Sequence, residues 1–546
     1  MKEKFNVVIS TLNSKYIHSS LAPWCLLAGV KEFCRADVNA KVMESTINAD
    51  LDSFANEIVK QKPDCVSFSC YIWNITKTLE LCKKIKSALN CVILLGGPEV
   101  AYRKQEVLKD YRFVDYVLSG EGEYCFPLFL DMLAGVLDKT EVDSLAYRDG
   151  ENIITVPEKC YCTTPPSPFC DEYFLAQKGR ISYIESSRGC PYRCAFCLSG
   201  RVSPLRFFDL ERVKSDILLL ANSGTKTIKF VDRTFNSKES HANAILEFIL
   251  QNYGKKIPHG VCFHFEIAGD ILKESTFEIL SKMPPFAVQL EIGMQSFNEQ
   301  TLALINRKTD TKKLISNIKR LISFNNMHIH IDLIAGLTGE DLESFEKSFD
   351  IGFDLRANML QLGFLKLLYG AAMREHPEKY PCEYSPNPPY EVISTPWLAA
   401  DEITRLHYCE NALDRLYNSG RFLFTVDYLL DCGFTPFRLF CKVGDIIKSS
   451  NLSPRELALV LYDSFSEHCD ADILKEKLVC DLVCASCYTE IPERLKLRHP
   501  HYKKLKQALP STCRAFVLEK SGKIFICDTA GKKDFFSRLE CEFTEI

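Results

Sequence analysis

Three cysteines in one short segment have the spacing of iron–sulfur ligands. Cys190, Cys194 and Cys197 are spaced CxxxCxxC. They follow an apolar run at 181–184, which is typical of a buried strand, and a turn at 186–189. Three thiolates on one loop can bind three irons of a cubane [4Fe–4S] cluster. The fourth iron then has no protein ligand, and an open metal position is a place for chemistry.

Two other interpretations of these cysteines remain to be weighed. The chain has 25 cysteines, so three ordinary buried thiols are a real alternative. A zinc site would need a fourth Cys or His nearby, usually in a second CxxC-like pair, and none follows Cys197 at that distance. We favour the cluster, because the strand before the loop and the barrel pattern after it supply the context that the motif requires.

The first part of the chain alternates between strands and helices. Apolar strands are expected at 5–11, from Val42, and at 64–70, 91–95 and 114–118. Such alternation with short connections predicts an α/β domain with a doubly wound parallel sheet.

Ligands of such sheets bind beyond the carboxyl ends of the strands. The candidate binding residues at these ends are Asn13, Tyr16, Ser69, Trp73, Gly96, Gly97, Glu99, Gly120 and Glu121. Glycines there let backbone amides approach a ligand closely. The alternative is that these glycines only form tight turns.

A second series of strands and helices follows a hairpin and a linker. The hairpin is expected at 145–156, turning at Asp149-Gly150, and the proline-rich linker at 163–168. Strands are then expected at 181–184, 228–231, 263–267, 288–292, 328–334 and 359–365. Six β/α units predict a partial (β/α)6 barrel with its chemistry on the loops at the carboxyl ends of the strands. The polar residues expected there are Asp232, Asn236, Glu266, Gln295, Ser296 and Arg307.

Beyond about residue 390 the pattern is mainly helical, with helices expected at 399–418 and 453–467 and a terminal hairpin at 515–526. Cys480, Cys484 and Cys487 repeat the CxxxCxxC spacing there. They are a candidate second cluster, but we interpret them as core residues, because 481–483 predicts a helix or a buried strand. The expected domain limits are 1–138, 139–175, 176–390 and 391–546.

Composition narrows the functional classes. The 546 residues have a net charge of −4, which gives no global basic field for nucleic acid. No run reaches the ~18 apolar residues of a membrane span, and the Lys-rich N-terminus lacks the apolar core of a signal peptide. We therefore expect a cytoplasmic protein. Without a secretion signal, the cysteines are better explained as reduced thiols and metal ligands, which suits a reducing, anaerobic cell.

The cysteine loop resembles the signature of the radical S-adenosylmethionine (SAM) enzymes, whose open iron chelates the amino and carboxylate groups of SAM. The loops Gly96-Gly97-Pro98-Glu99 and Gly120-Glu121-Gly122-Glu123 resemble those of the cobalamin-binding domain upstream of many radical SAM cores, the class B type. Mutase-type cobalamin domains carry Asp-x-His-x-x-Gly. His18 has neither that Asp nor that Gly nearby, so we expect no histidine ligand to cobalt and a hydrogen-bonding role for His18. The C-terminal part resembles an extension of unknown function found in one subgroup.

The resemblance also implies roles for the residues at the barrel rim. It places Asp232 to Asn236 at the SAM amino group, although the family's Gly-Gly-Glu sequence is absent there. It places Glu266, Gln295 and Ser296 at the ribose and adenine, and Arg307 at the SAM carboxylate. For each of them, the alternative is a satisfied polar residue of the barrel interior.

The implied function is that of a cobalamin-dependent radical SAM enzyme. An electron enters the cluster, from a donor such as flavodoxin or ferredoxin, and SAM is cleaved to methionine and a 5′-deoxyadenosyl radical. The radical takes hydrogen from an unactivated carbon of an unknown substrate, which then receives a methyl group from methylcobalamin; a second SAM remethylates the cobalamin. The cofactors carry the hard chemistry and the protein positions them.

Three other functions remain open. One is a radical SAM rearrangement or cyclisation without methyl transfer. Another is a cobalamin- or iron–sulfur-sensing protein with a structural cluster. A third, a tRNA-modifying methylthiotransferase, would need a second three-cysteine domain upstream and a basic nucleic-acid-binding appendage. Neither feature is apparent in the sequence.

Overall fold

The computed structural model describes residues 5–157, 164–201, 204–485, 491–500, 505, 507–531 and 538–545. The chain divides into two compact units. The first unit comprises Met1–Ile292, Ile305–His328 and Lys366–Val392, and the second comprises Gly293–Leu304, Ile329–Leu365 and Ile393–Ile546.

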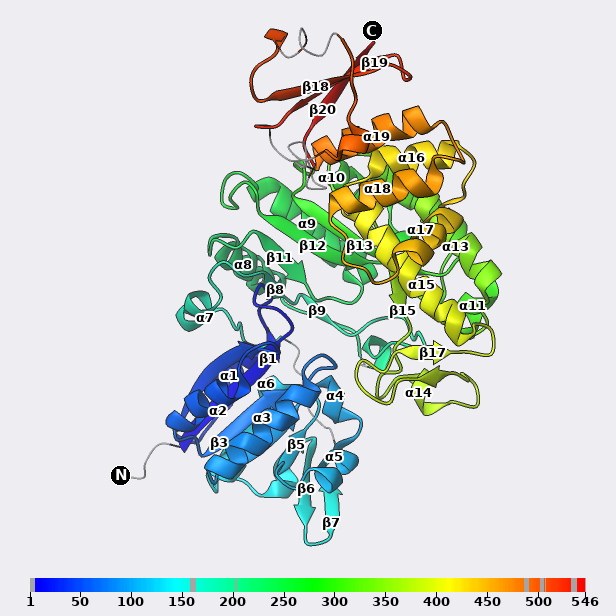
Figure 1. The fold of residues 1–546 in the computed structure, drawn as a ribbon. Coiled ribbons are helices and arrows are strands. Elements are labelled where there is room, and N and C mark those ends of the chain that lie inside the picture. Colours follow the sequence, from blue (N-terminus) through cyan, green and yellow to red (C-terminus); the bar gives the residue numbers. More distant parts are fainter. Residues whose placement is uncertain are drawn as a thin grey trace. The chain divides into compact units, whose positions relative to one another are not determined.

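A doubly wound sheet forms the N-terminal part of the first unit (Figure 1). Its strand order is β2-β1-β3-β4-β5-β6-β7. The parallel strands are β1 (Phe5–Asn13), β2 (Val38–Thr46), β3 (Cys65–Ser69), β4 (Val92–Gly96) and β5 (Tyr116–Leu118). The predicted sheet is therefore confirmed.

The expected hairpin extends this sheet. It consists of β6 (Leu145–Asp149) and β7 (Asn152–Thr155), and β6 pairs antiparallel with β5. Asp149 pairs with Asn152, so the two loop residues are Gly150 and Glu151. The turn expected at Asp149-Gly150 is thus displaced by one residue, because Asp149 completes the ladder.

Helices cover both faces of the N-terminal sheet. They are α1 (Ala22–Phe33), α2 (Leu51–Lys60), α3 (Ile75–Ala88), α4 (Pro98–Ala101), α5 (Lys104–Asp110) and α6 (Gly122–Leu133). Side chains of β1, β3 and β4 form one buried cluster with those of α2 and α3, including Val8, Val66 and Ile58. Burial of these apolar side chains supplies the main driving force for this layer. The helices α1 and α6 pack closely, since a Cβ at Gly29 would lie 2.1 Å from the Glu123 carbonyl oxygen.

The six strands predicted for the barrel are all present. They are β8 (Ser182–Ile184), β11 (Thr227–Phe230), β12 (Cys262–Ile267), β13 (Val288–Gln295), β14 (His328–Ala335) and β15 (Met359–Phe364), in the order β15-β14-β13-β12-β11-β8. The strands β8, β11, β12 and β13 pair in parallel, as do β14 and β15. The intervening helices are α8 (Leu210–Ala221), α9 (Glu239–Asn252), α10 (Glu274–Ser281), α11 (Glu299–Leu304), α12 (Thr311–Ser323) and α13 (Leu342–Asp354). This pattern is the partial barrel that the sequence predicts.

Short elements occupy the connections of this region. They are α7 (Asp171–Ala176), β9 (Ser187–Arg188), β10 (Arg206–Phe207), α14 (Ala372–Glu375), β16 (Glu383–Tyr384) and β17 (Val392–Ser394). The strands β9 and β10 form a two-stranded antiparallel ladder that the sequence did not predict.

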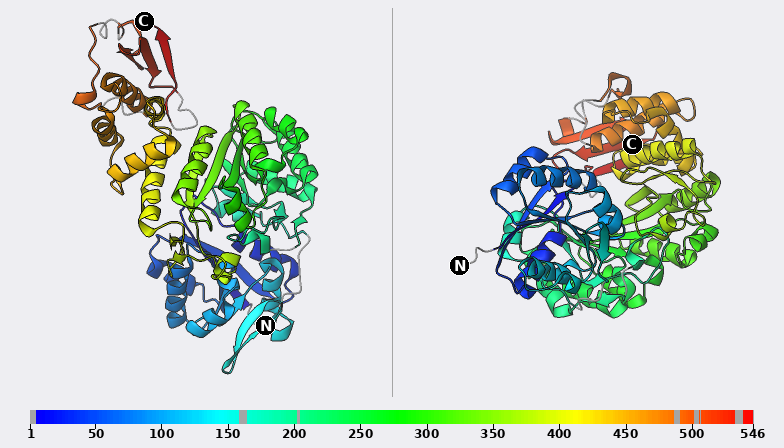
Figure 2. Two further views of the ribbon diagram at one scale, coloured as in Figure 1. Left: turned by 90° about the vertical axis from the view of Figure 1, so that its right-hand side faces the viewer. Right: turned by 90° about the horizontal axis from the view of Figure 1, so that it is seen from below.

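The C-terminal part of the second unit is helical, as expected, and ends in a small sheet (Figure 2). Its helices are α15 (Ala400–Leu413), α16 (Leu423–Asp431), α17 (Pro436–Ile447), α18 (Pro454–Phe465) and α19 (Ala471–Cys484). The predicted terminal hairpin corresponds to β18 (Cys513–Leu518) and β19 (Lys523–Asp528), and β20 (Cys541–Glu545) adds a third antiparallel strand.

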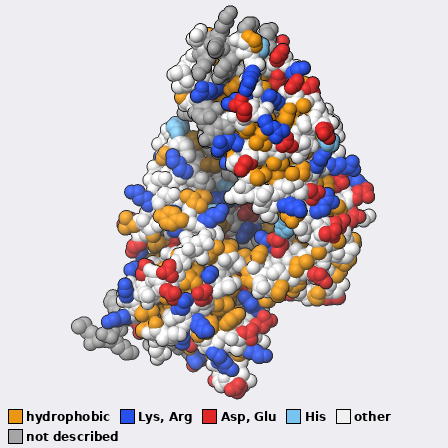
Figure 3. All heavy atoms as spheres, viewed as in Figure 1, with side chains coloured by type: hydrophobic (Ala, Val, Ile, Leu, Met, Phe, Trp, Pro, Cys, Tyr) orange, Lys and Arg blue, Asp and Glu red, His pale blue; other side chains and the backbone are white. Residues whose placement is uncertain are grey.

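Charge is mixed over the surface. Acidic and basic side chains are interspersed on the face shown in Figure 3. Among the described residues, no helix is both long and apolar enough to cross a bilayer.

Candidate functional site

The cysteine loop follows β8 and is fixed by backbone contacts within the first unit. Gly189 adopts φ 101°, a conformation that favours glycine. The Ala195 amide donates to the Ile305 carbonyl at 2.8 Å, and the Ala195 carbonyl accepts from the Met373 amide at 3.0 Å. The loop also closes on itself, because a Cβ at Gly200 would lie 2.3 Å from the Tyr192 carbonyl oxygen. Three segments distant in sequence thus set the shape of the loop.

Each of the three cysteine sulfurs has a hydrogen-bonding group nearby. The Thr234 hydroxyl lies 3.2 Å from Cys190 Sγ. Arg307 Nη1 donates to Cys194 Sγ at 3.7 Å, and the Ser199 amide donates to Cys197 Sγ at 3.4 Å. The Arg307 and Ser199 donors stabilise thiolates and tune an iron–sulfur cluster. The Thr234 hydroxyl also donates to the Arg233 carbonyl at 2.7 Å.

Two opposing effects act on the pKa of Cys194. Burial raises the pKa of Cys194, and the Arg307 guanidinium acts in the opposite direction. Among the described residues, no group of three or more His, Cys, Asp or Glu side chains surrounds a single ion. In a [4Fe–4S] cubane each cysteine binds a different iron, and the CxxxCxxC spacing on one loop suits this arrangement. The three residues and their donors therefore fit a [4Fe–4S] cluster.

Asp232 and Asn236 lie at the predicted rim, but their side chains have protein partners. Asp232 accepts hydrogen bonds from the Ser186 amide at 2.9 Å, the Ser186 hydroxyl at 2.7 Å and the Ser187 hydroxyl at 2.5 Å. Complete burial raises the pKa of Asp232 to about 6 against these bonds. The Asn236 amide group bonds both the carbonyl and the amide of Ala268 at 2.8 and 2.9 Å. These two side chains hold the turn before the cysteine loop and the end of β12, so their contact with SAM stays a prediction.

Other rim residues differ in how they are engaged. The half-buried Glu266 lies 3.4 Å from Arg233 Nη1, an arginine that the sequence analysis did not single out. In the second unit, Gln295 adopts φ 69°, and its buried Oε1 has no hydrogen-bond partner among the described residues. An unsatisfied buried acceptor is the kind of group that a ligand with a donor would complete.

Ser296 belongs to a buried carboxylate network that the sequence analysis missed. The Ser296 hydroxyl donates to Glu340 Oε1 at 2.5 Å, and the Ser348 hydroxyl donates to the same atom at 3.3 Å. Burial raises the pKa of Glu340 to about 7. The available signal was the loop Gly336-Leu337-Thr338-Gly339-Glu340 directly after β14, which has the glycines and the carboxylate of a strand-end site.

The candidate residues of the N-terminal sheet lie at the carboxyl ends of its strands, as predicted. Asn13 ends β1, Ser69 ends β3, Gly96 ends β4 and Gly120 follows β5. Gly97 has φ 97°, and a Cβ there would lie 2.5 Å from the Cys70 carbonyl oxygen. A residue with a side chain would not fit here, so glycine is required for β3 and β4 to end side by side.

Two carboxylates at these strand ends are bound by other protein groups. Glu99 is buried and accepts from Arg103 Nη2 at 2.9 Å and from the Tyr390 hydroxyl. Glu121 pairs with Arg188 at 3.1 Å and with Arg206. The expected cobalamin contacts of these two side chains stay predictions, and no local sequence pattern indicates their distant partners.

Two aromatic side chains, Tyr16 and Trp73, and the imidazole of His18 lie near the strand ends of the N-terminal sheet. Tyr16 is 72% exposed and Trp73 is 48% exposed, so both are accessible to a ligand. His18 Nδ1 lies 2.7 Å from the Tyr183 hydroxyl, which agrees with the expected hydrogen-bonding role. Burial lowers the pKa of His18.

Models of three protein families match consecutive parts of the chain. The B12 binding domain matches residues 10–130, and the radical SAM superfamily matches residues 184–351. A protein of unknown function (DUF4080) matches residues 378–520. The first match covers the N-terminal sheet and the second covers the cysteine loop. The chain combines a B12-binding domain with a radical SAM domain.

Curated relatives of this B12-binding radical SAM chain include several methyltransferases. It is 27% identical over 317 residues to the 2-(S-pantetheinyl)-carbapenam-3-carboxylate methyltransferase of Streptantibioticus cattleyicolor, covering 52% of this chain and 44% of that protein. It is 27% identical over 337 residues to the hopanoid C-3 methylase of Methylococcus capsulatus, covering 57% and 60%. The chain thus spans about half the length of the curated relatives it matches.

Solved structures share the fold of the B12-binding radical SAM chain. The cobalamin-dependent radical SAM enzyme OxsB with bound aqua-cobalamin aligns with a TM-score of 0.64 at 14% identity, over 93% of this chain and 81% of that one. The methyltransferase TsrM from Kitasatospora setae, with cobalamin and a [4Fe–4S] cluster, aligns with a TM-score of 0.58 at 15% identity, over 69% and 78%.

The second CxxxCxxC segment is only partly described. Cys480 and Cys484 are buried on α19, as expected of core residues, and Cys487 lies outside the described residues. Cys484 interacts with Cys527 and Cys541, which form a cross-strand pair of β19 and β20. Hydrogen bonds from these two thiols lower the pKa of Cys484.

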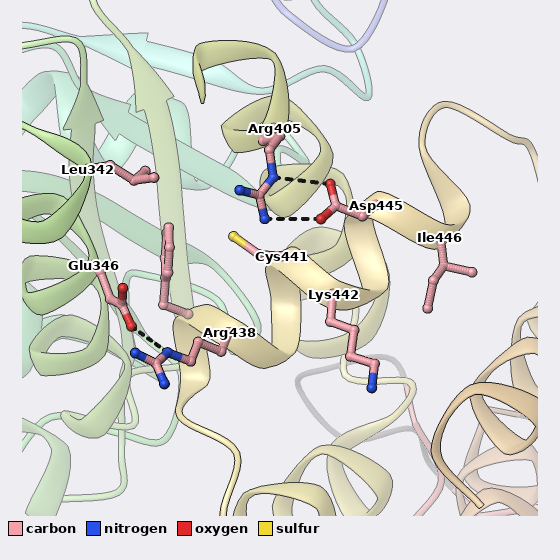
Figure 4. Close-up of a pocket in the computed structure, with 9 residues that line it drawn as sticks. Leu342, Glu346, Arg405, Arg438, Cys441, Lys442, Asp445 and Ile446 are labelled. Carbon is pink, nitrogen blue, oxygen red and sulfur yellow. Dashed lines mark hydrogen bonds and ion pairs between the residues drawn. The ribbon is translucent and has the colours of Figure 1, made fainter. Parts of the chain in front are cut away.

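A surface cavity of about 390 Å³ opens in the second unit between α13, α15 and α17. Its charged side chains largely satisfy each other: Arg405 pairs with Asp445 and Arg438 pairs with Glu346 (Figure 4). Such surface pairs leave few polar groups for a bound ligand.

Proposed function

We propose that this chain is a radical SAM enzyme that binds a [4Fe–4S] cluster, SAM and cobalamin and methylates an unactivated carbon. The observation that carries the proposal is the CxxxCxxC loop, in which each sulfur has its own hydrogen-bonding group and the loop backbone is fixed at Ala195. Preorganised ligands with ordered donors are what a catalytic metal site requires.

The chain's own residues would bind and orient these cofactors. Cys190, Cys194 and Cys197 would hold the cluster, and Arg307 would offset negative charge beside Cys194. The buried acceptor of Gln295 would accept a hydrogen bond from SAM. Gly96 and Gly97 would shape the end of β4 at which cobalamin binds, since side chains there would meet the backbone at Leu118 and Cys70. When bound, the cofactors supply one-electron cleavage of SAM and a transferable methyl group.

Methyl transfer is supported by the names of the relatives. Two of them are the carbapenam carboxylate methyltransferase and the hopanoid C-3 methylase described above. A third is the cobalamin-dependent radical SAM methyltransferase TokK of Streptomyces tokunonensis. A 22% identical relative, the anaerobic magnesium-protoporphyrin IX monomethyl ester cyclase of Rubrivivax gelatinosus, makes ring closure the second candidate. Identification of the product distinguishes the two.

The proposed setting is a reducing, anaerobic cytoplasm. The 25 cysteines, three of them assigned to an oxygen-sensitive cluster, support this setting. The electron donor would be of the flavodoxin or ferredoxin class.

We also propose the domain limits 1–138, 139–175, 176–390 and 391–546.

Anaerobic reconstitution with iron, sulfide and hydroxocobalamin, followed by dithionite and SAM, tests the proposal. We expect an iron–sulfur spectrum, retained cobalamin and 5′-deoxyadenosine in the wild type. Cys194→Ala should form no 5′-deoxyadenosine. Cys432→Ala, which removes an exposed thiol, should behave as the wild type. Deoxyadenosine without retained cobalamin would overturn the cobalamin assignment, and an absent iron–sulfur spectrum would overturn the cluster.

A further inference from the structure

The cysteine loop begins and ends at a very short ladder. Arg188 of β9 stands directly opposite Arg206 of β10, and Ser187 stands opposite Phe207. The three cysteines lie between these two strands in sequence. Because the ladder has only two residues on each side, backbone pairing alone gives it little stability.

The ladder places two like charges opposite each other. Like charges at directly opposed positions of an antiparallel pair are destabilising. Both guanidiniums are also poorly solvated, since the Arg188 and Arg206 side chains are 17% and 10% exposed. Some group must therefore offset their repulsion for the ladder to stay closed.

Glu121 is the group that contacts both arginines. Its Oε2 lies 3.1 Å from Arg188 Nη1, and its Oε1 pairs with Arg206 Nη2. The Glu121 side chain is 8% exposed. Glu123 and Glu185 also pair with Arg188, each at 2.6 Å, whereas Glu121 contacts Arg206 as well.

The backbone of Glu121 belongs to the N-terminal sheet. Glu121 precedes α6 directly and follows the carboxyl end of β5, where the B12-binding model matches. A Cβ at Gly29 would lie 2.1 Å from the Glu123 carbonyl oxygen, so α1 packs closely against the first turn of α6. The Glu121 carboxylate is therefore carried by the turn that connects the end of β5 to α6.

We propose that Glu121 is a positioning residue that closes the cysteine loop by bridging Arg188 and Arg206, and that it thereby couples cobalamin occupancy to the stability of the iron–sulfur site. The inference rests on the proposed function for the identity of the two cofactors. A ligand that orders the turn at 119–121 also orders the bridge, and by linkage the two sites stabilise each other. We call Glu121, Arg188 and Arg206 the Glu121 clamp.

Four full-length variants test the clamp: Glu121→Gln, Glu185→Gln, Arg206→Gln and the double variant Glu121→Gln/Arg206→Gln. Glu185→Gln is the matched control, because it removes one carboxylate from Arg188 and keeps the bridge. The readouts are the rate of iron loss to a chelator with and without hydroxocobalamin, the EPR signal of the reduced cluster, and deuterium exchange of the amides of β9 and β10.

We expect Glu121→Gln to lose iron on the order of tenfold faster than Glu185→Gln, because it removes the carboxylate that bridges the two opposed guanidiniums. Hydroxocobalamin should slow iron loss in the wild type and in Glu185→Gln, but not in Glu121→Gln. The double variant should recover slow iron loss and slow exchange, since it removes the opposed charge as well. This rescue separates positioning from a general loss of folding.

Equal iron loss in Glu121→Gln and Glu185→Gln, no rescue in the double variant, or no effect of hydroxocobalamin in the wild type would overturn the clamp. These outcomes are distinct from failure of the proposed function. That failure would be a wild type with no iron–sulfur spectrum, no retained cobalamin or no 5′-deoxyadenosine, and the first two are read from the absorption spectrum before iron loss is measured.

Discussion

At the scale of single residues, the surroundings of the three cysteine sulfurs decide how the loop can work. A thiol buried in apolar surroundings resists ionisation, and burial does raise the pKa of Cys194. The Arg307 guanidinium, 3.7 Å from Cys194 Sγ, compensates for this. Arg307 should therefore affect the cluster's electronic properties as well as any ligand of the open iron.

We expect Arg307→Met to lower the reduction potential of the reconstituted cluster by about 60 mV, the tenfold unit for one electron, because reduction adds negative charge that the guanidinium offsets. An EPR-monitored redox titration measures the shift. Arg307→Lys keeps the positive charge, so its reduction potential should lie close to that of the wild type. The exposed Arg193 of the same loop is the matched control, and an equal shift in Arg193→Met would contradict the prediction.

Gly97 gives a second prediction at the residue scale. An alanine there combines a strained φ of 97° with a Cβ 2.5 Å from the Cys70 carbonyl, so we expect Gly97→Ala to weaken cobalamin binding by about tenfold or more. Spectral titration with hydroxocobalamin measures the affinity. Gly150→Ala shares the positive φ but has open space around its Cβ, so its affinity should match the wild type. Equal affinity of both variants would refute the close-approach argument.

At the scale of elements, a helix end in the second unit is completed from a distance. The helix α16 begins after Phe422, whose side chain gives no cap. Asp481 of α19 instead accepts from the Phe424 and Thr425 amides at 3.1 and 2.8 Å and from the Thr425 hydroxyl at 2.8 Å. These donors would otherwise be buried without a partner, so Asp481 joins α16 to α19.

Asp481→Ala should therefore destabilise α16 by about 2–4 kcal/mol, because two buried amides lose their acceptor. Deuterium exchange of the peptide that contains 423–431 measures the loss of protection. Asp472→Ala, at an exposed site in the first turn of α19, is the control. Unchanged protection in Asp481→Ala would show that the cap is dispensable.

The same carboxylate predicts a pH dependence. Burial raises the pKa of Asp481 from 3.8 to about 7 in the folded protein. The folded state therefore binds the proton more tightly, and this contribution to stability is complete below pH 3.8 and is lost as the pH rises through about 7. The protection of α16 in the wild type, relative to Asp481→Asn at the same pH, should fall between about pH 4 and 7. A flat difference over that range would exclude the titration of Asp481.

At the scale of the whole molecule, the C-terminal part of the chain is built into the second unit. Phe437 and Phe440 of α17 contact Phe349 and Phe353 of α13 with ring centroids 5.6 and 5.4 Å apart. The Tyr417 hydroxyl donates to the Ala357 carbonyl at 2.6 Å. Helices of the extension thus bury aromatic residues of a helix that belongs to the radical SAM match.

A chain that ends at residue 392 should consequently be insoluble or lose the order of β14 and β15, because Phe349 and Phe353, now 0% and 1% exposed, would face water. A chain that ends at residue 485 keeps α15 to α19, including Asp481, and is expected to stay soluble. Soluble expression and circular dichroism compare the two. Equal solubility would show that the extension is an independent domain.

The sequence by itself determined the strands, their order of appearance and the cysteine motif. Each of these depends on signals inside one segment: a buried strand needs an apolar run, and the CxxxCxxC spacing places three thiols on one loop. For the same reason all six barrel strands could be predicted within a few residues. Signals were weaker for β20 and for the ladder of β9 and β10, which are short and depend on a partner strand.

Only the tertiary structure decided what the polar residues at the strand ends contact. Glu121 is 85 residues from Arg206, and Asp232 is 46 residues from Ser186. The same carboxylate can bind a cofactor or a neighbouring arginine or serine, and local sequence does not distinguish these outcomes. The competition is resolved by which charged and polar groups the fold brings within hydrogen-bonding distance, since a buried carboxylate must find such a partner.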